Sequence, residues 1–62
     1  MVIISLDEKD YQKFKDALAK EVIKVDREKN LDINECTEIE VNGDVFIVCK
    51  LNKTVWKVYN KK

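Results

Sequence analysis

The stretch TEIEVNGDVFIVCKL, residues 37–51, decides the fold of this chain. Its centre, Asn42-Gly43, is the strongest turn signal in the sequence, because both residues tolerate the positive φ angles of a two-residue hairpin loop. Apolar and β-branched residues flank this turn, and a second polar turn follows them. The predicted strands are residues 37–41, 45–51 and 55–59. They are expected to form an antiparallel meander.

Upstream of the meander, the sequence predicts one amphipathic helix. Apolar residues recur there at intervals of three and four, at Tyr11, Phe14, Leu18, Val22 and Val25. Asp7 is the favoured N-cap and Asn30 a C-terminal stop, so the helix covers about residues 8–28. Residues 21–29 are rich in β-branched side chains and could equally begin a strand, but the apolar stripe continues through them in register. A short strand at residues 2–6 completes a β-α-β-β-β order.

The expected fold is therefore a small α+β domain, an antiparallel sheet covered on one face by one helix. Sixty-two residues allow a single domain, 1–62, in which residues 59–62 are expected to form a flexible basic tail. The pattern does not say where the first strand lies in the sheet.

The composition argues against several classes of function. The chain has no histidine, the commonest catalytic base and metal ligand, and a single glycine, which rules out a glycine-rich phosphate loop. We therefore expect no enzymatic activity, no metal or cofactor and no small-molecule substrate. No apolar run approaches the length of a membrane span, so no membrane partner is expected.

The two cysteines, Cys36 and Cys49, are too few for a disulfide framework. We expect reduced thiols and a cytoplasmic location. Eleven lysines and five asparagines against one arginine are typical of AT-rich coding DNA, as in an accessory protein of a bacterium or its phage.

The hairpin register decides which side chains share a face of the sheet. A two-residue loop places Cys36 opposite Cys49, the register that an interstrand disulfide would need. A three-residue loop with a glycine bulge pairs Ile39 with Val45 and groups apolar residues with apolar ones, so it is preferred. In either case a two-residue second turn would place Trp56 opposite Cys49.

This preferred register predicts two faces of unusual composition. The face beneath the helix holds Val45, Ile47, Cys49, Leu51, Trp56 and Val58. The other face holds Phe46, Val48, Lys50, Val55, Lys57 and Tyr59. A solvated sheet face is normally polar, so the second set predicts a partner-binding surface unless the first strand covers it. The expected function is a non-enzymatic protein-interaction module that self-associates or binds a protein partner.

Charge is segregated along the chain. Residues 1–44 carry all twelve acids and seven bases, whereas residues 45–62 carry five lysines and no acid. Lysines beside aromatic residues suggest a second hypothesis, a single-stranded nucleic-acid binder on the same face, which is less favoured because the chain lacks a recognised aromatic motif. The opposite charges also permit two-fold pairing of the chain with itself.

Overall fold

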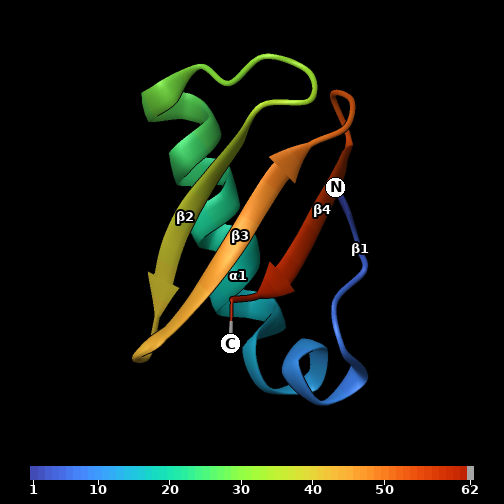
Figure 1. Cartoon of the computed structure of the whole chain (residues 1–62), viewed down its shortest axis with the longest axis vertical. Coiled ribbons are helices and arrows are strands. Elements are labelled where there is room, and N and C mark those ends of the chain that lie inside the picture. The colour runs from blue at the N-terminus through green and yellow to red at the C-terminus, as the bar shows by residue number, and fades with distance from the viewer. Residues whose placement is uncertain (62) are drawn as a thin grey trace.

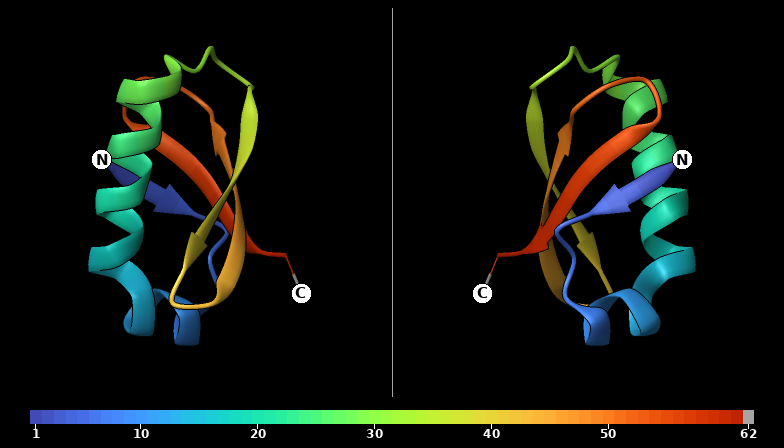
Figure 2. Two further views of the ribbon diagram at one scale, coloured as in Figure 1. Left: turned by 90° about the vertical axis from the view of Figure 1, so that its left-hand side faces the viewer. Right: turned by 90° about the vertical axis from the view of Figure 1, so that its right-hand side faces the viewer.

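The computed structural model describes residues 1–61, in which a helix packs against one face of a mixed sheet (Figures 1 and 2). In chain order its elements are β1 (Val2–Ile4), α1 (Glu8–Lys29), β2 (Cys36–Val41), β3 (Asp44–Lys50) and β4 (Val55–Asn60). The α+β class and the β-α-β-β-β order are confirmed.

The helix α1 begins and ends where its capping residues predict. The Asp7 carboxylate accepts a hydrogen bond of 2.9 Å from the amide of Lys9, which satisfies a donor of the first turn. At the other end Asn30 is left-handed, with φ 49° and ψ 56°, and its amide donates to the Asp26 carbonyl. Residues 21–29 are helical, because their apolar side chains continue the buried stripe.

The strand order in the sheet is β1-β4-β3-β2. The last three strands form the predicted meander, and β1 lies parallel to β4 at one edge, so the sheet is mixed and not wholly antiparallel. The amide of Val2 donates to the Thr54 carbonyl at 2.6 Å, which ties the N-terminus to the turn before β4. The helix carries the chain behind the sheet from one edge strand to the other (Figure 1).

The β2–β3 hairpin closes with the two-residue loop Asn42-Gly43, whose φ angles are 52° and 87°. Positive φ at both positions defines a type I′ loop, the form whose twist matches that of the flanking strands. Ile39 therefore pairs with Phe46. The expectation of a three-residue loop with Ile39 opposite Val45 is wrong by one residue, because the turn chemistry outweighs the grouping of apolar side chains.

The β3–β4 turn is one residue longer than expected, so that Lys50, and not its neighbour, pairs with Trp56. The side chain of Asn52 explains the extra residue. Its Oδ1 accepts hydrogen bonds from the amides of Thr54, at 2.8 Å, and Val55, at 2.9 Å. This Asx turn satisfies the backbone of the wider loop.

Both corrections concern β3, and together they turn that strand over. Phe46 and Val48 are fully buried beneath α1, whereas Val45 and Ile47 face away from the helix. The strands β2 and β4 keep their predicted faces, because the two one-residue errors cancel between them.

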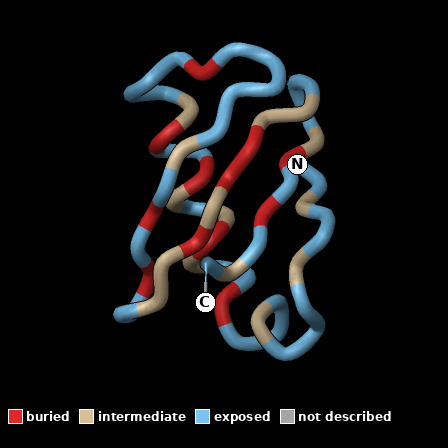
Figure 3. Tube along the Cα trace, viewed as in Figure 1, coloured by how far each residue is buried: buried red, intermediate tan, exposed pale blue. Residues whose placement is uncertain are grey.

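The core lies between α1 and the sheet (Figure 3). Its buried members are Phe14, Leu18, Val22, Val25, Leu31, Ile39, Val41, Phe46, Val48, Trp56 and Val58. At its centre the rings of Phe14 and Phe46 meet edge to face, with centroids 5.3 Å apart. Four of the core residues belong to the predicted apolar stripe of the helix, and two come from the overturned strand. Tyr11, the fifth member of the predicted stripe, is exposed.

The C-terminal segment is held to the sheet further than expected. Tyr59 and Asn60 belong to β4, and the amide of Lys61 donates to the Val45 carbonyl at 2.8 Å. Residues 59 and 60 of the expected tail are thus part of a strand, and Lys62 lies outside the described residues.

Candidate protein-interaction surface

The face of the sheet turned away from α1 is hereafter called the open face; it is the side toward the viewer in Figure 1. Its residues alternate along each strand with those of the core. They are Val2 and Ile4 on β1, Val55, Lys57 and Tyr59 on β4, Val45, Ile47 and Cys49 on β3, Cys36, Glu38 and Glu40 on β2, and Leu51 and Lys61 just beyond β3 and β4. Within residues 1–61 no helix or strand covers this face (Figure 2).

The centre of the open face is apolar. Val45 and Ile47 of β3 are half-buried, and Ile47 pairs with Tyr59, which is 41% exposed. At the edge, Val2 and Ile4 are 52% and 40% exposed. A sheet face in contact with water normally carries polar residues at these alternate positions. Val45, Ile47 and Tyr59, hereafter called the apolar strip, depart from that pattern.

Charged side chains flank the apolar strip with opposite signs on its two sides. Glu38 and Glu40 lie on β2, whereas Lys57 lies on β4 and Lys61 directly after it. The Lys61 Nζ reaches across β3 to the Glu38 Oε2 at 2.7 Å, and the Lys57 Nζ lies 5.7 Å from the ring centroid of Tyr59. The open face therefore has an apolar centre, with two glutamates on the β2 side and two lysines on the β4 side.

A disulfide joins β2 to β3 on the open face. Cys36 and Cys49 are directly opposite, with Cα atoms 4.0 Å apart, and their sulfur atoms are bonded. The expectation of reduced thiols is wrong: it rested on the small number of cysteines, whereas the two-residue loop brings the two directly opposite each other. The expectation of a cytoplasmic location loses that support.

The six residues predicted for the site lie on two different sides of the sheet. Phe46 and Val48 are in the core, and their predicted place on an exposed face is wrong. Lys50 also points to the helix side, where its Nζ lies 2.9 Å from the Asp26 Oδ1 and 3.2 Å from the Leu31 carbonyl oxygen. The other three, Val55, Lys57 and Tyr59, do lie together on the open face.

Sequence reasoning missed the residues that β3 and β2 contribute to this face. The preferred register places Val45 and Ile47 in the core, and the predicted site does not include Glu38 and Glu40. The signal that identifies them is Asn42-Gly43, because a type I′ loop at this dipeptide places all four on one side of the sheet.

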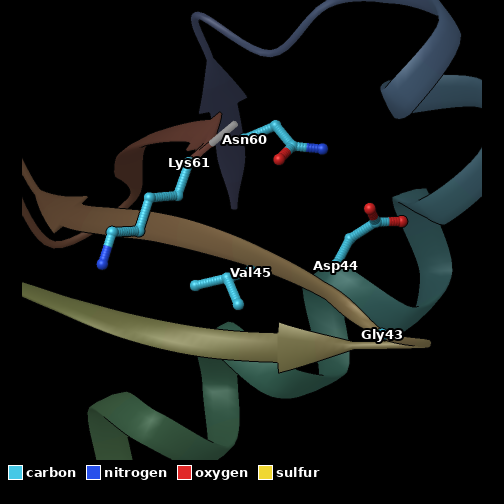
Figure 4. Close-up of a pocket in the computed structure, with 5 residues that line it drawn as sticks. All are labelled: Gly43, Asp44, Val45, Asn60 and Lys61. Carbon is cyan, nitrogen blue, oxygen red and sulfur yellow. The ribbon is translucent and has the colours of Figure 1, made fainter.

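The hollows of the surface are shallow. One of about 310 Å³ lies at the hairpin end of the sheet and is lined by Gly43, Asp44, Val45, Asn60 and Lys61 (Figure 4). In that view the Lys61 side chain extends over β3 beside Val45. Among residues 1–61 no group of three or more histidine, cysteine or acidic side chains could hold a metal ion. No helix in the described part of the chain is long and apolar enough to cross a membrane.

No protein-family model, curated protein sequence or solved structure matches this chain. Its function is therefore inferred from the open face and from the chemistry of that surface.

Proposed function

We propose that this chain is a non-enzymatic protein-interaction module whose open face binds a protein surface. The observation that carries the proposal is the apolar strip of Val45, Ile47 and Tyr59, which the helix leaves uncovered. Burying apolar area contributes roughly 25 cal/mol per Å², so a partner that covers the strip is favoured over water.

The arrangement of charge supports a protein partner. Glu38, Glu40, Lys57 and Lys61 surround an apolar centre, and an apolar centre with a polar rim is the usual layout of a protein–protein interface. On the helix, the exposed apolar side chain of Ile23 is set among charged residues. Isolated apolar residues of that kind are common on protein surfaces.

The chemistry of the open face supports binding over catalysis. Its carboxylates, Glu38 and Glu40, are exposed to solvent, and its cysteines are joined to each other. A disulfide offers no thiolate to act as a nucleophile.

The nucleic-acid alternative is weaker on this face than on the one predicted from the sequence. Phe46, one of the two aromatic side chains predicted on that face, is buried. Tyr59 is the aromatic side chain that lies on the open face, where Glu38 and Glu40 would repel phosphates.

Site-specific photo-crosslinking in the cells that produce the chain tests the proposal. The photoreactive residue benzoylphenylalanine replaces either Tyr59 on the open face or Tyr11 on the helix, which are matched in exposure at 41% and 45%. We expect a discrete protein adduct from position 59 and none of that mass from position 11. The adduct's mass also shows whether the partner is another protein or a second copy of the chain.

A second substitution, added to the chain that carries the photoreactive residue at position 59, makes the test specific to the open face. Ile47→Lys places a charge beside Tyr59 on the open face, and Ile23→Lys places the same charge on the helix. We expect the position-59 adduct to fall with Ile47→Lys and to persist with Ile23→Lys. The same adduct from both tyrosine positions, or no adduct from either, would contradict the proposal.

A further inference from the structure

We propose that the occupant of the open face is a second copy of this chain, packed sheet to sheet about a two-fold axis that runs parallel to β3. This inference rests on the proposed function, because it uses the same face and names what covers it.

The charge layout favours a second copy. Acidic Glu38 and Glu40 lie on one side of β3, and basic Lys57 and Lys61 lie on the other. A surface that carries both signs on opposite sides of an apolar strip is complementary to itself, because a two-fold axis along the strip exchanges the two sides. A second copy therefore supplies the complementary charges itself, and no other charged protein has to be assumed.

The same layout selects the direction of the axis. An axis parallel to β3 lays β4 of one copy over β2 of the other, so that Lys61 faces Glu40 and Lys57 lies one residue row from Glu38, and the two-fold axis repeats these contacts. An axis across the strands lays β2 on β2 and β4 on β4, which brings glutamates toward glutamates and lysines toward lysines. The first arrangement also suits aligned sheet packing, in which strands of the two layers run within about 30° of each other.

The apolar residues lie where such a pair needs them. In aligned packing the inner faces interdigitate about 10 Å apart, and the axis places Val45, Ile47 and the Cys36–Cys49 disulfide of each copy at the centre. The exposed Lys61–Glu38 ion pair now spans this centre, with side chains 56% and 53% exposed. On pairing, these two side chains exchange partners between copies, at small cost since exposed ion pairs contribute little.

The area of the open face sets the affinity that we expect for the dimer. The molecule measures 27 × 19 × 19 Å, so its largest face offers about 500 Å² per copy, below the roughly 800 Å² of a standard interface. We therefore expect a weak, reversible dimer with a dissociation constant on the order of 10⁻⁵ to 10⁻³ M.

Charge variants and sedimentation equilibrium of the oxidised chain, at concentrations up to about 1 mM, test the arrangement. Glu38→Lys with Glu40→Lys should weaken the dimer at least about tenfold, because lysine then faces lysine across the axis. A control pair on the exposed side of the helix, Asp16→Lys with Glu28→Lys, makes the same change in net charge. We expect it to leave the dissociation constant within about threefold of the wild type.

The decisive variant exchanges all four charges. Glu38→Lys, Glu40→Lys, Lys57→Glu and Lys61→Glu together keep the net charge at zero. This variant should pair with itself as strongly as the wild type does, and should not pair with the wild type, which is measured by fluorescence energy transfer between labelled copies. An axis across the strands predicts the reverse, so strong mixing with the wild type would overturn the proposed geometry.

The outcomes separate this inference from the proposed function. A wild-type chain that stays monomeric at about 1 mM overturns the second copy as occupant. Crosslinking of Tyr59 to a different protein would then still support the open face as a binding surface. Circular dichroism and a thiol titration of each variant establish that the fold and the disulfide are intact before its affinity is compared.

Discussion

Replacing Phe46 by alanine tests which side of β3 faces the core, the point on which the composition of the open face depends. Phe46 has no exposed surface, and its ring contacts that of Phe14 at 5.3 Å. Truncation of a buried phenylalanine to alanine typically costs 3–5 kcal/mol. A domain of this size has a total unfolding free energy of roughly 3–9 kcal/mol, so we expect Phe46→Ala to remove at least about a third of it and, at the lower end of that range, to unfold the chain at 25 °C.

The neighbouring residue supplies the matched control. Ile47 is half-buried on the open face, with no helix above it. We expect Ile47→Ala to lower the unfolding free energy by no more than about 1.5 kcal/mol, since part of its side chain is already in water and no helix packs on it. Phe46→Leu, which keeps most of the buried volume, should cost an intermediate amount and keeps the comparison measurable if Phe46→Ala does not fold.

Urea unfolding, followed by circular dichroism and by fluorescence of the buried Trp56, measures all three variants. The expected order of destabilisation is Phe46→Ala, then Phe46→Leu, then Ile47→Ala. If Ile47→Ala costs as much as Phe46→Ala, then β3 has the opposite face toward the helix and the open face is wrongly composed.

Three further outcomes follow from the same contacts. Cys36 and Cys49 are separated by 13 residues, so replacing both by serine, or reducing them, should lower the unfolding free energy by about 3 kcal/mol; an unchanged urea midpoint after reduction would contradict the disulfide. Gly43→Ala should cost about 1 kcal/mol, measured by thermal unfolding, because Gly43 has a φ of +87° while a Cβ there meets nothing within 4 Å; a larger loss would point to a contact that is absent from this loop. A fluorescent single-stranded oligonucleotide should show no saturable anisotropy change in low salt; tight binding whose affinity falls steeply with added salt would favour the nucleic-acid alternative.

The helix could be predicted from the sequence almost to its ends because two independent signals agree there. The stripe from Phe14 to Val25 has the helical period, and Asp7 and Asn30 supply the caps at the two ends of that stripe. The hydrogen bonds that fix these ends join residues close in sequence, so local chemistry suffices to place them.

The face of β3 could not be predicted from its own pattern. Val45, Phe46, Ile47 and Val48 are all apolar, so turning the strand over exchanges one apolar set for another and the hydrophobic pattern does not choose between them. The choice is made by the two turns, and the longer one depends on the side chain of Asn52 as a hydrogen-bond acceptor. The disulfide depends on the same choice, because the two-residue loop is the one that places Cys36 opposite Cys49.

The position of β1 in the sheet is fixed by a strand that lies far away in the sequence. Three residues, Val2–Ile4, pair in parallel with a strand more than fifty residues later in the chain, and no pattern in so short a segment identifies that partner. The existence of an apolar second face was nevertheless predictable, because the three meander strands carry more apolar residues than one helix covers. Half of its predicted members, Val55, Lys57 and Tyr59, are placed on it.

Methyl NMR of the wild-type chain in a dilution series tests most directly that the open face is the contact surface. The methyl groups of Val45 and Ile47 report on the open face, and those of the exposed Ile23 report on the helix. We expect the signals of Val45 and Ile47 to shift progressively as the concentration rises to about 1 mM, and that of Ile23 to stay fixed. Shifts centred on Ile23, or no shift at any of the three residues, would contradict pairing through the open face.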